Sequence, residues 1–390
     1  MKMRRVAVIG IGITEFGELW DASFRKLGIG AGLAAVEDAK ISADQIDAMY
    51  VGNMSAGRFI RQEHVAALIA DYSGLARDHI PATRVEAAGA SGGLALRQGF
   101  LAVASGLHDI VVVGGAEKMT DVSDMESSMI QSSAADQEWE TELGATFASL
   151  HALIATRHMH DYGTTREQLA DVAVKNHRHG SLNPKAQFRR EITRDVVLRS
   201  PIVASPLRMF DCAPSSDGAA AVVLCPLDAA KKYAETPVEI TGSGQASDSL
   251  ALHHRKDICT MAATKVAAER AFKMAGLSQK DVQVVEVHDN FTISEILAVE
   301  DMGFFPKGEG GKATEEGRTS LGGDVAVNTS GGLKARGDPI GATGVAQAVE
   351  IVTQLRGKAD KRQVKDAAVG LAQNVGGTGA TVVVHIFRRA

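Results

Sequence analysis

The chain has 390 residues, a formal net charge of -5 and a hydrophobic content of 45%. This length corresponds to two or three domain-sized units with a substantial buried core. The acidic balance excludes the broad basic surface of a nucleic-acid-binding protein, and no apolar run reaches the roughly 18 residues of a membrane span.

The three cysteines, Cys212, Cys225 and Cys259, are odd in number and widely spaced. This argues against a disulfide framework and against a zinc knuckle. The N-terminal run "MKMRRVAVIGIG" lacks the small-residue cleavage site of a signal peptide, and we interpret it as a buried first strand. We therefore expect a cytoplasmic protein that binds no metal.

Strand-like runs alternate with helix-like segments, which is typical of an α/β architecture. In the first part of the chain, "RRVAVIGIG" predicts a strand and residues near 22–40 predict an amphipathic helix. Further strands are expected at "AMYVGN", "DIVVVGGAEKM" and "AAAVVLC", the last near residues 219–225.

A second set of elements begins at "VEITGSG" and continues with a helix near 262–276 and the runs "VQVVEVHDNF" and "DVAVNTSGG". A helix near 343–356 follows, and its apolar residues recur at i, i+3, i+4 and i+7 from Val345 to Val352, which predicts one buried face. The last strands are expected in "AAVGLAQNVGG" and "ATVVVHIF".

The two parts share one plan. In each, a strand ends in a small or polar turn that leads into a helix, as in "RVEAAGASGGLALRQGF" and "VVEVHDNFTISEILAVE". In each, a later strand ends in a double glycine. The pattern predicts a duplicated βαβ fold. Residues from about 120 to 205 are polar and mostly helical, and we interpret them as an insertion that covers the site.

The stretch "VEAAGASGG", residues 85–93, is typical of a strand, a tight turn and a helix start. That geometry can hold a nucleophile at a helix N-terminus, where free N–H groups stabilise an oxyanion. The residue at the tip of this turn is Gly89, which has no side chain.

Three later loops follow strands, so they are expected at the sheet edge where α/β proteins bind ligands. His288 and Asn290 can donate hydrogen bonds to a developing oxyanion, and Asp338 can accept a proton. Glycines in the same loops allow the backbone to approach a substrate. The expected substrate-binding residues are Ser91, Asn328, Asn374, Gly376 and Gly377.

Three other features give weaker signals. Gly10, Gly12 and Gly17 do not fit the dinucleotide-binding pattern, because the third glycine comes too late. The histidines of the insertion have poor chelate spacing and are expected at the surface or in packing. The cluster around Arg189 and Arg190 is either a solvated face or a contact for the phosphates of a large anionic ligand.

The sequence resembles the thiolase superfamily over nearly its full length. The motifs "GNMSAGRFIRQEHVAALIAD", "GGAEKMTDV", "SSDGAA", "VNTSGGLKARGDPIGATG" and "NVGGTGATVVVHI" are similar to those of archaeal acetoacetyl-CoA thiolases and sterol-carrier-protein-type thiolases. The resemblance implies an α/β thiolase fold with two duplicated βαβαβ halves in a five-layer α-β-α-β-α arrangement. The expected N-terminal half is 1–120 with 206–235, the loop domain 121–205 and the C-terminal half 236–390.

The resemblance also implies a substrate and partners. The expected substrate is a coenzyme A thioester, with no permanently bound cofactor. A homodimer or a dimer of dimers is expected, and a small zinc-ribbon/OB-fold protein is a possible partner.

The same motifs depart from the thiolase pattern at the reacting residues. The family has its nucleophilic cysteine where Gly89 stands, a second cysteine where Asn290 stands and a histidine where Asp338 stands. Classical thiolases place a cysteine near the position of Asn374. His288 is retained, and its family role is to bind the thioester oxygen.

An acyl-enzyme needs an atom that carries the acyl group, and Gly89 offers none. Three hypotheses follow. In the first, the protein makes or breaks a C–C bond beside a CoA thioester by aldol chemistry, with Asp338 as the base. In the second, it is a thiolase-family acetyltransferase that is inactive or inactivated. In the third, it is a non-catalytic acyl-CoA-binding or scaffold subunit of a thiolase complex.

Overall fold

The computed structural model describes residues 3–390. Its N-terminal half contains five paired strands: β1 (Val6–Ile13), β2 (Ala48–Gly52), β3 (Ala82–Val85), β4 (Val111–Glu117) and β7 (Gly218–Pro226). They lie in the order β3-β2-β4-β7-β1. β2 is parallel to β3 and β4, whereas β7 is antiparallel to β4 and β1.

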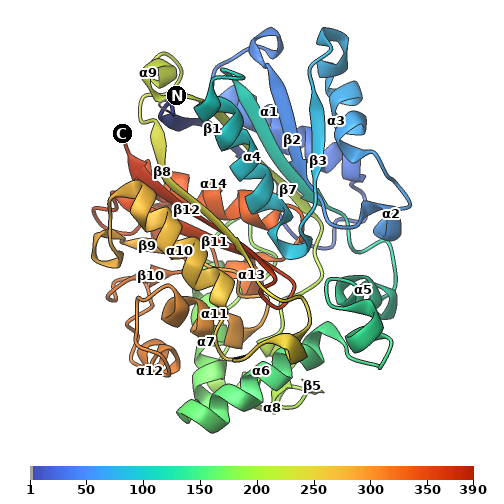
Figure 1. Cartoon of the computed structure of the whole chain (residues 1–390), viewed down its shortest axis with the longest axis vertical. Coiled ribbons are helices and arrows are strands. Elements are labelled where there is room, and N and C mark those ends of the chain that lie inside the picture. Colours follow the sequence, from blue (N-terminus) through green and yellow to red (C-terminus); the bar gives the residue numbers. More distant parts are fainter. Residues whose placement is uncertain (1–2) are drawn as a thin grey trace.

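The C-terminal half repeats this arrangement with β8 (Val238–Ser247), β9 (Val284–Glu286), β10 (Ala326–Val327), β11 (Val369–Gly376) and β12 (Thr381–Arg389). Their order is β10-β9-β11-β12-β8, with parallel and antiparallel pairs at the same places. β1 and β8 pair over three residues and join the two sheets edge to edge (Figure 1). The predicted duplication is confirmed.

Two helices form the central layer between the sheets: α4 (Ser91–Ser105) and α14 (Thr343–Leu355). One apolar cluster contains residues from both helices and from both sheets. On the outer face of the N-terminal sheet lie α1 (Phe24–Asp38) and α3 (Val65–Ser73). On the outer face of the C-terminal sheet lie α10 (Ala262–Ala275) and α11 (Thr292–Asp301). The order of layers is therefore α-β-α-β-α.

Helix α14 differs from its sequence prediction. The spacing of its apolar residues predicts one buried face, but nearly all of its residues are buried, because a sheet covers it on each side. Its buried polar side chains are held by hydrogen bonds: Gln347 donates to the carbonyl of Gln373, and Glu350 pairs with Arg362. Buried polar groups with such partners need not face water.

The segment between β4 and β7 is mostly helical, as expected. It contains α5 (Asp124–Ser132), a π-helix (Gln137–Thr141), α6 (Phe147–Tyr162), α7 (Arg166–Ser181) and α8 (Arg194–Arg199). A small hairpin of β5 (Ile202–Ala204) and β6 (Leu207–Arg208) follows. Figure 1 shows α5 to α8 gathered in the lower part of the view, away from the two chain ends.

The short helices are α2 (Ala56–Phe59), α9 (Leu227–Ala230), α12 (Gly310–Glu315) and α13 (Gly332–Arg336). Among residues 3–390, no helix combines the length and the apolar character that crossing a bilayer requires.

Candidate active site

The predicted loops meet at one cavity, which lies beyond the carboxyl ends of the parallel strands of both halves. The enclosed part of the cavity is small, with a volume of about 40 Å³, and the cavity opens to solvent. Five of the predicted site residues line it: Gly89, His288, Asn290, Asp338 and Gly377. The other lining residues are Met54, Gln131, Ala134, Phe147, Ala213, Phe291, Ile340 and Val375.

Gly89 lies in a short 3-10 turn, Ala88–Ala90, that leads directly into α4. The preceding Ala88 has φ +50°, a left-handed conformation that costs energy in a residue with a side chain. An ideal Cβ on Gly89 would lie 2.4 Å from the carbonyl oxygen of Val375 and 2.9 Å from His288 Nε2. Position 89 therefore faces His288, and a side chain there would require the turn or β11 to shift, because the carbonyl oxygen of Val375 lies too close.

His288 is buried, and its Nδ1 lies 3.0 Å from the Nδ2 of Asn374. Its Nε2 faces Gly89 across the cavity. Burial lowers the pKa of His288 to about 3, and repulsion from Arg336, and from His151 when that ring is protonated, adds to this effect. The imidazole is therefore neutral near pH 7, and it can polarise a carbonyl as a hydrogen-bond donor rather than as a cation.

Asn290 lines the same cavity. Its Oδ1 accepts from the hydroxyl of Ser294 at 2.8 Å and from the backbone N–H of Phe291 at 3.1 Å. These two bonds fix the carboxamide at the start of α11. Asn290 and His288 both line the cavity, and the two bonds at Oδ1 leave the Nδ2 group free to donate elsewhere.

Asp338 is the carboxylate of the cavity wall. Its Oδ1 accepts from the hydroxyl of Thr343 at 2.7 Å, and its backbone N–H donates to Ser216 Oγ at 2.9 Å. Burial raises the pKa of Asp338 to about 6, although the Thr343 bond and the charge of Arg336 act in the opposite direction. A carboxylate with a pKa close to neutrality is a suitable general base.

Four residues predicted to bind substrate lie outside the cavity lining. Ser91 closes the Gly89 turn, since its hydroxyl donates to the carbonyl of Ala88 at 2.7 Å. Asn328 is fully buried, where its Oδ1 accepts from the N–H of Val287 at 2.9 Å and its Nδ2 donates to Glu295 at 2.7 Å. These side chains hold the loops in place.

The other two, Gly376 and Asn374, belong to β11. An added Cβ on Gly376 would lie 2.3 Å from the carbonyl oxygen of Ala87, so this glycine allows β11 to approach the Gly89 turn. Asn374 lies behind His288 and contacts its ring nitrogen.

Arg189 and Arg190 are exposed, and they follow a segment that is bound to α13. The backbone N–H groups of Gln187 and Phe188 donate to the carbonyls of Arg336 and Ala335, just before Asp338. Contact with CoA phosphates remains a prediction for these two arginines.

Sequence reasoning missed the role of Glu117, the last residue of β4. Its buried carboxylate accepts from the N–H groups of Met54 at 2.8 Å, Ser55 at 3.2 Å and Gly341 at 3.0 Å. Burial raises its pKa to about 7. Glu117 thus ties the loop that carries Asp338 to the loop after β2. The only sequence signal was an acidic residue at the end of an otherwise apolar strand.

His151 of the insertion packs behind the cavity. Its ring stacks on Phe291 with centroids 4.3 Å apart, and its Nδ1 donates to the carbonyl of Phe147 at 3.0 Å. Burial lowers its pKa to about 4. Within residues 3–390, no group of three or more His, Cys, Asp or Glu side chains is arranged to hold a metal ion.

The three cysteines are free thiols, and none of them belongs to the cavity lining within residues 3–390. Burial raises the pKa of Cys212 and Cys225 to about 12 and that of Cys259 to about 11. The thiolate is the reactive form of cysteine. These residues therefore do not replace a nucleophile at position 89.

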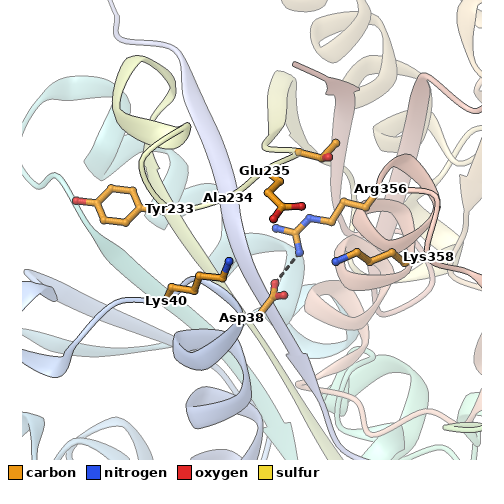
Figure 2. Close-up of a pocket in the computed structure, with 8 residues that line it drawn as sticks. Asp38, Lys40, Tyr233, Ala234, Glu235, Arg356 and Lys358 are labelled. Carbon is orange, nitrogen blue, oxygen red and sulfur yellow. Dashed lines mark hydrogen bonds and ion pairs between the residues drawn. The ribbon is translucent and has the colours of Figure 1, made fainter.

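A second hollow lies where α1 and α14 end and the chain passes from β7 to β8. Figure 2 shows the Arg356 guanidinium facing Asp38, with a distance of 2.6 Å between Nη1 and Oδ2. Lys40, Lys358 and Glu235 surround this ion pair. Residues from both halves of the chain line this hollow, and none of the predicted site residues is among them.

Comparison with known families agrees with this geometry. Residues 6–228 match the family described as "Thiolase, N-terminal domain", and residues 244–389 match "Thiolase C-terminal domain-like". The chain belongs to the thiolase family. The resemblance expected from the sequence motifs is confirmed, and so is the fold class.

Two thiolase-family relatives match the whole chain. It is 60% identical over 387 residues to the acetyl-CoA acetyltransferase of Methanothermobacter thermautotrophicus, which covers 99% of this chain and 100% of the relative. It is 52% identical over 395 residues to the acetyl-CoA acetyltransferase of Methanocaldococcus jannaschii, covering 99% of each. The chain is a thiolase-family enzyme of CoA thioesters.

A solved structure named "Ltp2-ChsH2(DUF35) aldolase" is also similar. The TM-score is 0.87 at 26% sequence identity, and the match covers 99% of this chain and 98% of that one. The thiolase fold of this chain is thus similar both to acetyltransferases and to an aldolase.

Proposed function

We propose that the protein catalyses aldol or retro-aldol chemistry on a β-hydroxyacyl-CoA, through a stabilised enolate and without an acyl-enzyme. The observation that carries this proposal is the closed position at Gly89. A Cβ there would lie 2.4 Å from the carbonyl oxygen of Val375, while His288 Nε2 faces the same point. The site therefore keeps an oxyanion donor, carries no nucleophile at position 89, and could accept one there only with a shift of the backbone.

The cleavage step balances without water or free CoA. Asp338 accepts the proton of the β-hydroxyl group, and the oxygen forms a carbonyl as the Cα–Cβ bond breaks. The electron pair of that bond forms the enolate of the CoA thioester. His288 Nε2–H and Asn290 Nδ2–H donate to the enolate oxygen. Protonated Asp338 then returns its proton to Cα, which gives an aldehyde or ketone and a shorter acyl-CoA.

The pKa values support these roles. The pKa of Asp338, raised to about 6, leaves the carboxylate mostly ionised at pH 7 but still basic enough to take a proton. The pKa of His288, lowered to about 3, keeps the ring neutral and able to donate throughout the working range. Preorganised donors of this kind are worth about 100-fold or more in rate.

The test is turnover of β-hydroxyacyl-CoA substrates, followed by release of the aldehyde or ketone and by chromatography of the shorter acyl-CoA. We expect product in equal amounts of the two fragments, and at least about a 100-fold loss of kcat in Asp338→Asn and in His288→Ala. A screen in which no β-hydroxyacyl-CoA is cleaved, although acyl-CoA binds, would favour the scaffold hypothesis.

A second candidate function is acetyl transfer, because the relatives at 60% and 52% identity are named acetyl-CoA acetyltransferases. Incubation with acetoacetyl-CoA and free CoA tests it through loss of the enolate absorbance. Intact-protein mass spectrometry after incubation with acetyl-CoA tests the covalent intermediate. A stable acetyl adduct together with thiolysis would replace our proposal with this one.

The proposal includes partners. The name of the structural relative includes the term DUF35. We propose that this chain binds a small partner protein of that kind, with a zinc ribbon and an OB-fold. We further propose that the chain forms at least a homodimer. Both statements are tested by co-expression with a candidate partner, followed by size-exclusion chromatography with light scattering. A 41 kDa monomer that does not bind the partner would contradict them.

A further inference from the structure

Asn374 is the only side chain that forms a hydrogen bond with a ring nitrogen of His288 within residues 3–390. We propose that Asn374 is a positioning residue that fixes His288 as the Nε2–H tautomer, so that the ring presents a proton rather than a lone pair to the cavity. The proposal rests on the proposed function only for the use of that proton in catalysis. The tautomer itself is a property of the free protein.

The argument begins at the start of α4. The first N–H groups of a helix have no acceptor inside the helix. The N–H of Gly93, in the first turn of α4, donates to Asn374 Oδ1 at 2.9 Å. Asn374 comes from β11 in the other half of the chain, so it caps this helix from outside. Because a backbone N–H can only donate, the atom facing Gly93 must be the amide oxygen.

The orientation of this carboxamide is fixed by packing as well. An added Cβ on Gly93 would lie 2.8 Å from Asn374 Oδ1, and one on Gly344 would lie 2.3 Å from it. The amide is thus enclosed by the first turns of α4 and α14, which lack side chains at these two positions. His385 Nε2 donates to the carbonyl of Gly93 at 3.0 Å and holds the same turn from its other side.

The tautomer follows from this orientation. With its oxygen on Gly93, Asn374 turns its NH₂ group to His288 Nδ1 at 3.0 Å. An NH₂ group can only donate, so Nδ1 must be the unprotonated nitrogen of the ring. The proton of the neutral imidazole then lies on Nε2, which faces Gly89. If the ring were protonated, the new Nδ1–H would face the N–H of Asn374, so two donors would point at each other. This unfavourable contact agrees with the lowered pKa of His288.

The experiment is NMR of the full-length protein with ¹⁵N-labelled histidine, in which the ring nitrogen shifts report the tautomer. In the wild type we expect His288 as Nε2–H and without titration between pH 5 and 9. Three other histidines serve as internal controls for the Nδ1–H tautomer. The Nδ1 of His151, His177 and His179 each lies within hydrogen-bond distance of a backbone carbonyl oxygen, which can only accept a hydrogen bond. Assignment of His288 uses His288→Gln.

The decisive variant is Asn374→Asp. An aspartate keeps an acceptor for the N–H of Gly93, but its second oxygen accepts from His288 Nδ1 instead of donating to it. We expect the His288 pKa to rise into the observable range, and the neutral ring above that pKa to carry its proton on Nδ1. Asn374→Ala, which offers neither donor nor acceptor, should give a mixture of the two tautomers.

Two outcomes would overturn the proposal: a wild-type His288 with its proton on Nδ1, or an Asn374→Asp protein with the wild-type tautomer and titration. A thermal melt of each variant shows whether the fold is kept. If cleavage activity is present, Asn374→Asp should lower kcat by about 100-fold at a pH where the Nδ1–H form dominates. If no β-hydroxyacyl-CoA is cleaved, the proposed function fails while the NMR result still decides the tautomer.

Discussion

Introducing a cysteine at Gly89 tests whether the protein is merely a thiolase that lacks one side chain. An ideal Cβ at this position lies 2.4 Å from the carbonyl oxygen of Val375, whereas ordinary contacts begin at 3.4 Å. The backbone of β11 or the Gly89 turn must therefore move by about 1.0 Å. Val375 is paired with Val382 of β12, which resists this movement. Overpacking of this kind costs about 1–3 kcal/mol of folding free energy.

Thermal unfolding and acylation measure the consequence. We expect Gly89→Cys to melt several degrees below the wild type and to form no acetyl adduct with acetyl-CoA by intact-protein mass spectrometry. Gly89→Ala should be destabilised to a similar extent, because the Cβ causes the contact. Gly30→Cys is the matched control, since a Cβ at Gly30 of α1 meets nothing within 4 Å. A Gly89→Cys protein as stable as Gly30→Cys, and acylated by acetyl-CoA, would refute the reasoning.

Further predictions concern the two buried carboxylates. The rate of cleavage should rise with pH through about 6 and then level off as Asp338 ionises, and a rate that is flat from pH 5 to 8 would exclude Asp338 as the base. Asp338→Asn should abolish turnover yet raise stability. Because folding raises the pKa of Asp338 from 3.8 to about 6, its ionised form destabilises the fold by about 3 kcal/mol above pH 6 and by nothing below pH 3.8. Thermal melts at pH 8 and pH 4 check this, with a gain expected at pH 8 alone. Glu117→Ala should destabilise the protein by at least about 2 kcal/mol in denaturant unfolding at pH 5, because the N–H groups of Met54, Ser55 and Gly341 lose their shared acceptor. Burial raises the pKa of Glu117 to about 7, so at pH 5 this carboxyl is protonated in the fold and the variant gains little from removal of a buried charge. Unchanged stability would show that Glu117 does not hold that loop.

The duplicated fold was accessible from the sequence because it rests on local patterns. Apolar runs and the two strand–turn–helix stretches predict the elements, and their repetition predicts the second half. The all-round burial of α14 was not accessible, because periodicity reports which face of a helix is apolar and not how many sheets cover it. From the sequence alone, the polar residue Gln347 is expected to face solvent. In the structure it is buried and donates a hydrogen bond to the carbonyl of Gln373 on β11.

The site was accessible in part. Glycines and polar residues after strands predict which loops meet, and five of the expected residues line one cavity. The sequence does not show which amide faces substrate and which supports another residue. Asn290 lines the cavity, whereas the side chain of Asn328 forms hydrogen bonds with the backbone N–H of Val287 and with Glu295. The closing of the Gly89 position depends on the backbone carbonyl of Val375, and a carbonyl leaves no sequence signal.

The charge in the cavity explains how these features act together. Among the cavity-lining residues of the described chain, Asp338 is the only carboxylate, and the donors His288 and Asn290 are neutral. In the proposed cleavage, Asp338 takes a proton as the enolate forms, so one negative charge would move from the carboxylate to the thioester oxygen. The number of buried charges is therefore unchanged. A cationic histidine would form an ion pair with the Asp338 carboxylate before the reaction, and this ion pair would be lost when Asp338 takes the proton. Neutral donors stabilise the enolate without the loss of such an ion pair. The lowered pKa of His288 and the raised pKa of Asp338 are thus two parts of one electrostatic arrangement.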